Sequence, residues 1–131
     1  MICRFLIAAF MHRHRRKCMH EVGLIQNLLV IATKTARDSN ASQIHELRLR
    51  VGAMSGVVPE ALQFAFEVVR KGTMAEGGAL VIEAVPAGSW CDQCQAEFVI
   101  QDYSYECPKC HRMCSELRRG MELELASMEV S

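Results

Sequence analysis

The sequence has no apolar run that approaches the roughly 20 consecutive residues a helix needs to span a bilayer. It also has no internal repeat and no low-complexity tract. Half of its 131 residues are apolar, which is enough to build a packed core in one ordinary domain or two very small ones. The chain is therefore predicted to be soluble, with no part in a membrane.

Net charge is also absent, because 15 Lys and Arg residues balance 15 Asp and Glu residues. The balance hides an asymmetry. Residues 1–18 carry five bases and no acid, which leaves 10 bases against 15 acids in the other 113 residues. An acidic body repels the phosphate backbone of nucleic acids, so the charge pattern argues against a nucleic-acid partner.

A convincing export signal is missing as well. A secretory signal places its positive charge before an apolar run and a cleavage site after it, whereas here the apolar run from Phe5 to Met11 precedes the basic residues. We interpret residues 1–18 as a leader that is either a disordered arm or the upstream translation of a gene whose true start is Met19. Without export, the seven cysteines fit a reducing cytosol, and the protein is predicted to be cytoplasmic.

Two helices are predicted from apolar residues that recur at three- and four-residue steps. The first runs from Glu21 to about Arg37 and ends at the turn-forming Asp38-Ser39-Asn40. The second begins at Pro59, which suits the first helical position, and closes at Gly72. The apolar stripes are Val22, Ile25, Leu28, Leu29, Ala32 and Ala36 in the first helix and Leu62, Ala65, Phe66 and Val69 in the second.

Three strands are predicted from the alternation of apolar and polar residues. Their bounds are Leu47–Val51, Ala79–Val85 and Met121–Leu125. Beyond the third strand, Met128 and Val130 fall on the opposite parity, which predicts a β-bulge near Ala126-Ser127.

The order of these elements predicts a small α/β two-layer domain of the α+β kind, in which two helices pack on one face of a three-stranded sheet. A cysteine-rich segment interrupts this domain before its last strand. We expect residues 19–88 and 120–131 to form the α/β domain, and residues 89–119 to form a separate lobe like a zinc ribbon.

The inserted segment, from Trp90 to His111, reads WCDQCQAEFVIQDYSYECPKCH. It holds two C-x2-C pairs separated by twelve residues, and this spacing lets two turns each direct a pair of thiolates at one ion. Coordination by four sulfurs is typical of structural zinc and leaves no open position for catalysis. The alternatives are a disulfide pair or four unrelated buried cysteines. The predicted zinc ligands are Cys91, Cys94, Cys107 and Cys110.

No catalytic constellation accompanies these cysteines, so the chain is predicted not to be an enzyme. Gly77-Gly78 is too short to cradle a phosphate, and His45 stands alone at the start of a strand. Cys114 is interpreted as a spare cysteine, with an alternative ligand or a redox-sensitive thiol as the other readings. His111 could replace a cysteine ligand, hydrogen-bond to a thiolate and tune the site with pH, or be merely exposed.

A second candidate metal site is the tripeptide Met19-His20-Glu21, just before the first helix. If Met19 is the first residue, its amine, the imidazole of His20 and the amide nitrogens between them lie within chelating reach of one ion. Nitrogen ligands in a plane suit Ni(II) or Cu(II). Taken alone, the tripeptide is weak evidence.

Together with this tripeptide, several short motifs resemble the HypA/HybF family of nickel metallochaperones, which mature [NiFe]-hydrogenase. The motifs are Arg50-Val51-Gly52-Ala53-Met54-Ser55, Phe64-x-Phe66-Glu67, Gly72-Thr73, Ala75-Glu76-Gly77, Trp90-Cys91-x-x-Cys94 and Cys107-Pro108-x-Cys110-His111. The resemblance covers Met19 to about Val130 and implies the fold predicted above.

The resemblance implies that Met19 and His20 bind nickel with support from Glu21, and that the four cysteines hold structural zinc. It also implies two partners, the nickel-handling GTPase HypB and the precursor of the hydrogenase large subunit, and it leaves a homodimer open. This sequence departs from the family pattern in two ways. The leader places the Met19 amine in a peptide bond, and Cys114 adds a thiol beside the zinc ligands.

Two other functions compete with nickel transport. One is a zinc-ribbon module that binds protein or nucleic acid, although the acidic body and the lack of a basic, aromatic-interleaved face disfavour nucleic acid. The other is a thiol–disulfide enzyme built on C-x2-C, which needs an accessible cysteine of low pKa.

Overall fold

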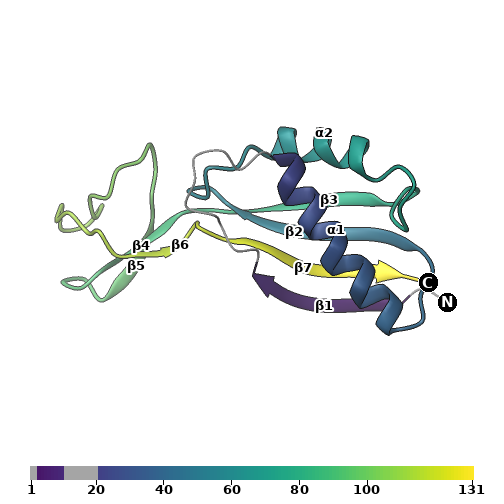
Figure 1. The fold of residues 1–131 in the computed structure, drawn as a ribbon. Helices are drawn as coiled ribbons and strands as arrows, with labels where there is room; N and C mark the ends of the chain where they lie inside the picture. Colours follow the sequence, from purple (N-terminus) through teal and green to yellow (C-terminus); the bar gives the residue numbers. More distant parts are fainter. Residues whose placement is uncertain (1–2, 11–20) are drawn as a thin grey trace.

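The computed structural model describes residues 3–10 and 21–131, which form an elongated molecule with two lobes (Figure 1). The larger lobe, here called the body, consists of β1 (Cys3–Phe10), α1 (Glu21–Asp38), β2 (Ile44–Gly52), α2 (Pro59–Val69), β3 (Ala79–Val85) and β7 (Leu123–Val130). The smaller, the cysteine lobe, spans residues 88–119 and contains β4 (Gly88–Cys91), β5 (Ala96–Val99) and β6 (Leu117–Arg119). The predicted two-layer fold with an inserted four-cysteine lobe is confirmed.

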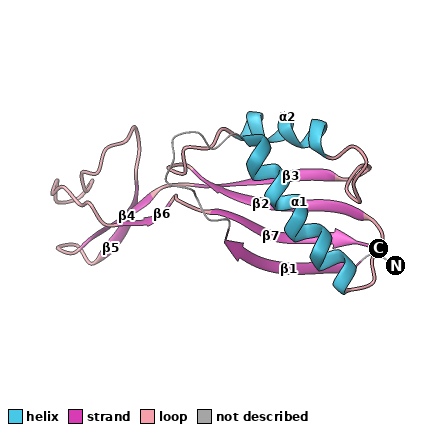
Figure 2. Cartoon of the chain, viewed as in Figure 1, coloured by secondary structure: helices cyan, strands magenta, loops and turns pink. Residues whose placement is uncertain are grey.

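The sheet of the body has the strand order β1-β7-β2-β3. β2 and β3 are parallel and are connected through α2, whereas β7 is antiparallel to both of its neighbours. Figure 2 shows both helices on one side of this sheet. The last strand of the chain therefore lies inside the sheet, with its outer neighbour contributed by the first strand.

The core lies between the helices and the sheet. In β2, Leu47, Leu49 and Val51 are buried, whereas Arg48 and Arg50 between them are half-buried and make ion pairs. This alternation is the two-residue period of a strand with one face on a core. The helices complete the core with residues of the two predicted stripes, Ile25, Leu28, Leu29, Ala32, Ala36, Leu62, Ala65 and Phe66. Val22 is the exception, because its side chain is exposed.

The predicted bulge in the last strand is confirmed at Ala126. Arg48 of β2 pairs with Ser127, but the next residue, Leu49, pairs with Leu125, so Ala126 is an extra residue in β7. The extra residue reverses which parity faces the core, and Leu125 and Met128 are consequently both fully buried.

The sheet has four strands and not the predicted three, because residues 3–10 form β1. β1 pairs with the edge of β7 that β2 leaves open, from Cys3 opposite Val130 to Phe10 opposite Glu124. An unpaired strand edge presents free backbone donors and acceptors, and an apolar run is a suitable partner for it. Residues 3–10 of the predicted leader thus lie in a strand, while residues 11–18 lie outside the described part of the chain.

The two connections to the cysteine lobe are both held by the loop that follows β2. The backbone N–H of Ala53 donates to the carbonyl of Val85 (2.9 Å), and the N–H of Met54 donates to the carbonyl of Gly120 (2.7 Å). Gly120 has φ of 115°, a conformation that favours glycine. A β-carbon on Gly52 would collide with the backbone of Gly120. Position 52 must therefore be glycine, because the chain passes too close to Gly120 here for any side chain.

We expect Gly52→Ala to lower the free energy of unfolding of the body by about 2 kcal/mol, because the added methyl group meets backbone and not a movable side chain. Urea unfolding followed by circular dichroism measures this loss. Gly77→Ala is the matched control, since a β-carbon there has open space around it. Equal stability of the two variants would contradict the close crossing.

Candidate metal centre

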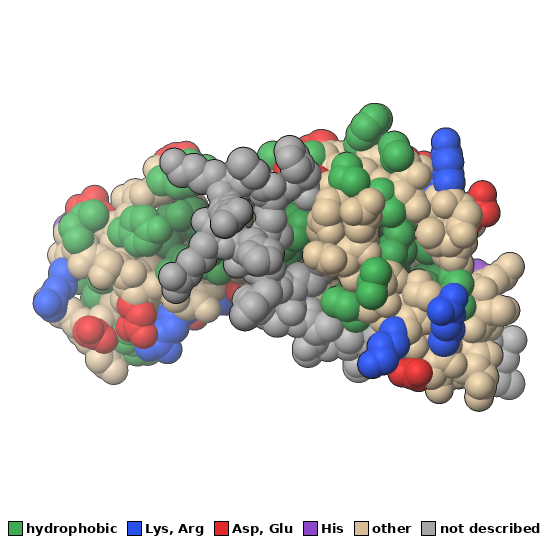
Figure 3. Space-filling view, viewed as in Figure 1, with side chains coloured by type: hydrophobic (Ala, Val, Ile, Leu, Met, Phe, Trp, Pro, Cys, Tyr) green, Lys and Arg blue, Asp and Glu red, His purple; other side chains and the backbone are tan. Residues whose placement is uncertain are grey.

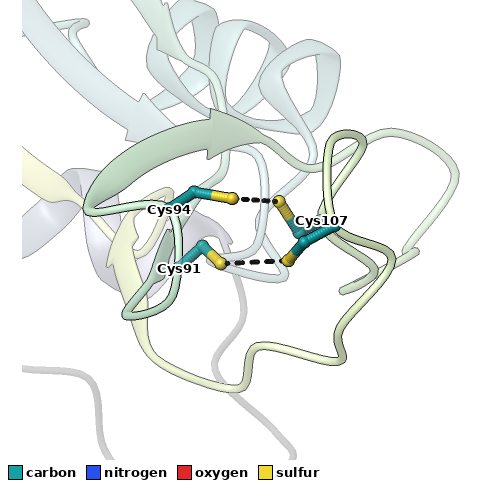
Figure 4. A group of neighbouring side chains, drawn as sticks. Cys91, Cys94 and Cys107 are labelled. Carbon is teal, nitrogen blue, oxygen red and sulfur yellow. Dashed lines mark hydrogen bonds between the residues drawn. The ribbon is translucent and has the colours of Figure 1, made fainter.

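Two loops bring the four predicted zinc ligands together within the cysteine lobe (Figure 4). Cys91 ends β4 and Cys94 lies in the turn before β5, while Cys107 and Cys110 come from the loop before β6. All four Sγ atoms lie within 4.8 Å of one another. The closest pairs cross between the loops, with 3.5 Å from Cys91 to Cys110 and 3.8 Å from Cys94 to Cys107.

These distances fit a tetrahedral zinc site. Four sulfurs about 2.3 Å from a common centre are separated by about 3.8 Å along the edges of the tetrahedron. A disulfide requires about 2.05 Å between sulfurs, and all four cysteines are free. The sulfur geometry therefore favours a metal ion over the disulfide alternative.

The backbone of each loop prepares one of its thiols for metal binding. A hydrogen bond from the backbone of Cys94 lowers the pKa of Cys91 to about 6, and the backbone of Cys110 likewise lowers the pKa of Cys107. In contrast, the side-chain hydrogen bond to Cys110, together with burial, raises the pKa of Cys94 to about 12. A soft divalent cation bound by all four sulfurs displaces the remaining protons.

The same geometry argues against a thiol–disulfide enzyme. A redox cysteine of low pKa must be accessible to its substrate. Cys91 has the lowered pKa, but its side chain is fully buried. Cys107 is also buried, so neither activated thiol is presented at the surface.

Cys114 packs against the four-sulfur cluster without belonging to it. Its side chain is 7% exposed and contacts the cluster, and its thiol donates to the carbonyl of Arg112 at 3.5 Å. Burial raises the pKa of Cys114 to about 11, so its thiol stays protonated near neutrality. This placement fits the interpretation of Cys114 as a spare cysteine.

His111 follows the last ligand in a left-handed conformation, with φ of 61°. Its ring is 73% exposed, and Nδ1 lies 3.3 Å from a carboxylate oxygen of Glu106. Its backbone N–H, and not its ring, serves the site by donating to the carbonyl of Cys107 at 2.9 Å. The structure therefore favours the exposed placement, while a role in pH tuning stays a prediction.

We expect His111→Ala to keep its full zinc content, because the substitution removes no thiolate and leaves the backbone donor in place. Any effect should appear only in how nickel binding depends on pH near neutrality. Metal analysis and nickel titrations between about pH 6 and 8 measure both properties. Superimposable titrations for the two proteins would remove His111 from the mechanism.

Ser89 is a structural residue of the site that the sequence pattern did not reveal. Its side chain is fully buried, and its hydroxyl lies 2.8 Å from the carbonyl of Cys114 and 2.9 Å from that of Glu116. Ser89 thereby links β4 to the segment from Cys114 to Glu116, which follows the four cysteines in the chain. A single serine forms no recognisable sequence pattern, so its structural role is identified only by its hydrogen-bond partners.

Met19 and His20 of the predicted nickel site lie outside the described residues. Glu21, the third residue of that site, is half-buried and begins α1. Figure 1 shows that α1 begins at the end of the body nearer to the cysteine lobe. The positive end of the helix dipole favours a carboxylate at this position.

No helix in the described part of the chain is long and apolar enough to cross a membrane.

A family model described as "Hydrogenase/urease nickel incorporation, metallochaperone, hypA" matches residues 19–130. The hydrogenase maturation factor HypA of Picosynechococcus sp. is 47% identical over 112 residues, which cover 86% of this chain and 99% of that protein. The HypA of Chloroflexus aurantiacus is 38% identical over 112 residues, with 85% and 98% covered.

Solved structures agree in fold. The solution structure of the Ni metallochaperone HypA from Helicobacter pylori matches with a TM-score of 0.60 at 24% identity, covering 86% of this chain and 97% of that one. Another HypA solution structure matches with a TM-score of 0.65 at the same identity and coverage. A metallochaperone carries its metal and does not catalyse a reaction, which confirms the prediction of a non-enzymatic protein. From Met19 to Val130, this chain belongs to the HypA family of metallochaperones for nickel incorporation into hydrogenase and urease.

Proposed function

We propose that this protein carries Ni(II) in the cytoplasm and delivers it to the precursor of a [NiFe]-hydrogenase large subunit, in cooperation with the GTPase HypB. The observation that carries the proposal is the family match, which begins at Met19, the first residue of the candidate nickel site. The relatives named above are hydrogenase maturation factors, which supports hydrogenase as the acceptor.

The resident metal of the cysteine lobe is proposed to be zinc, held by Cys91, Cys94, Cys107 and Cys110. Four sulfurs at these distances suit Zn(II), and a site without an open position stabilises the fold without taking part in a reaction. Apart from these cysteines and Cys114, the hydrophobic cluster of this lobe contains only Phe98. Residues 89–119 are accordingly proposed as a folding unit that depends on its metal.

Nickel, the cargo, is proposed to bind at the start of the family-matched segment. The donors are the amine of Met19, the imidazole of His20 and the amide nitrogens between them, with Glu21 in support. Amine and deprotonated amide nitrogens impose a strong field, which favours the planar coordination of a d8 ion and gives Zn(II) no comparable advantage. The two metals are thus separated by donor type, nitrogen for the cargo and sulfur for the resident ion.

The proposal is tested by transfer of nickel to an acceptor. Protein beginning at Met19, loaded with one equivalent of Ni(II), is mixed with the nickel-free precursor of the hydrogenase large subunit, and the two are separated and analysed for metal. We expect nickel to move to the precursor, and HypB with GTP to accelerate the transfer. The matched control is His20→Ala, which should deliver none while its zinc remains. Transfer at the same rate from free nickel would contradict a carrier role.

A further inference from the structure

A groove of about 580 Å³ runs between α1 and α2 on the outer side of the helical layer. Its lining includes the apolar side chains of Leu29 and Val30 of α1 and Val69 at the end of α2, beside polar and charged residues of α1 and Thr73. These residues belong to neither metal site.

Both helices that flank the groove also expose large apolar side chains. Val30 is 69% exposed on α1, and Phe64 is 73% exposed on α2, where Val68 follows one turn later on the same side. Figure 3 shows hydrophobic side chains gathered over the two helices, with Lys and Arg side chains near the end of α1. Each helix therefore carries exposed apolar side chains among the polar residues of its solvent side.

The charged rim of the groove is basic and has no partner among the described residues. Lys34 and Arg37 line it with a single acid, Asp38, and neither base makes an ion pair with a side chain of residues 21–131. Elsewhere in the same part of the chain, five arginines do make ion pairs, namely Arg48, Arg50, Arg70, Arg118 and Arg119. Positive charge beside an exposed apolar groove complements an apolar segment that carries carboxylates.

We propose that this groove binds an amphipathic helix of a partner protein, whose apolar side chains enter the groove and whose acidic side chains pair with Lys34 and Arg37. A helix fits better than an extended peptide because the lining comes mainly from α1, with Val69 at the end of α2 and Thr73 beyond it. The backbone groups of α1 are already hydrogen-bonded within the helix, so the groove offers no strand edge to an extended chain. A helical ligand satisfies its own backbone and needs only side-chain contacts.

A second copy of this chain is a poorer occupant. A symmetric dimer through the groove places the same patch of each copy against the other. Lys34 and Arg37 of one copy then approach the same two bases of the other, and like charges oppose the contact. The groove also lies along α1 away from its first turn, so a bound helix leaves Glu21 and the cysteine lobe accessible. The proposal is therefore independent of nickel binding.

The test uses two synthetic helical peptides that share one leucine face. One carries glutamates beside that face, and the other carries lysines at the same positions. Binding to the full, zinc-loaded chain is measured by fluorescence anisotropy, and the contact surface is mapped by amide chemical shifts. We expect the glutamate peptide to bind at least tenfold more tightly and to shift the amides of Val30, Thr33 and Val69. The double variant Lys34→Glu/Arg37→Glu should reverse the preference.

Val30→Asp should weaken binding of the glutamate peptide at least tenfold, because it places a negative charge on the apolar part of the groove. Its matched control is Val99→Asp, which changes another exposed valine, on the cysteine lobe, and should leave the dissociation constant within about twofold. Unchanged circular dichroism and zinc content confirm that both variants fold. Equal binding of the two peptides, shifts confined to another surface, or self-association that Val30→Asp abolishes would each overturn the proposal.

Discussion

Cys107→Ala is expected to release the metal of the cysteine lobe and to unfold residues 88–119 while the body stays folded. The substitution removes one of four sulfurs, and structural zinc contributes roughly 10 kcal/mol or more to the folding of such small units. The lobe has no core to replace that contribution, because its hydrophobic cluster consists of the cysteines and Phe98. The body has its own separate core of α1, α2 and the sheet.

Elemental analysis and amide hydrogen exchange measure this outcome together. We expect the zinc content to fall from one per chain to none and the lobe amides to exchange at the rates of an unfolded chain, with unchanged protection in β2 and β7. Cys114→Ala is the matched control, because it removes a buried cysteine that is not among the four, and it should retain zinc. Stoichiometric zinc and full lobe protection in Cys107→Ala/Cys114→Ala/His111→Ala would contradict the assigned ligands.

Protein that begins at Met19 is expected to bind one Ni(II) per chain in a planar, diamagnetic form, and the 131-residue chain is expected to bind it more than tenfold more weakly. In the longer form the nitrogen of Met19 is an amide, which is a far poorer donor than an amine. Chelation depends on all arms closing on one ion, so the loss of one arm costs more than about 1.4 kcal/mol. Any nickel held by the longer form should use other donors, such as His12, His14, Cys18 and His20.

Nickel titrations of the two purified forms, followed by absorbance to report geometry, measure this difference. His20→Ala in the shorter form serves as the control, because it should abolish planar nickel binding while zinc remains in the cysteine lobe. Equal affinities and equal spectra for the two forms would mean that the amine is not a ligand. The proposed nickel site would then be wrong in its central detail.

The sequence was most informative where a local pattern decides the structure. The two C-x2-C pairs bring their own sulfurs into reach through short turns, so spacing alone identified the four thiols. The helices of the body and the bulge at Ala126 followed from apolar periodicity in the same way.

Partners distant in the chain were harder to predict. The pairing of β1 with β7 joins residues more than 110 positions apart, and no local pattern encodes the choice of partner. The strands β4, β5 and β6 have only three or four residues each, too few for alternation to stand out. The groove between α1 and the end of α2 depends on how the two helices pack, which no local pattern encodes. Val22 was predicted to belong to the buried stripe of the first helix, and only the structure shows that its side chain is exposed.

The interior position of β7 has a consequence for biosynthesis. Ribosomes release a chain from its N-terminus onward, so β2 and β3 emerge well before residues 123–130 are available to pair with them. The hydrogen-bonding edges of β1 and β2 that face β7 stay open until β7 is available to pair with them. All four ligand cysteines precede β7, so a nascent chain can acquire its resident metal before the sheet is complete. Metal binding by the cysteine lobe can therefore begin before the sheet of the body closes around β7.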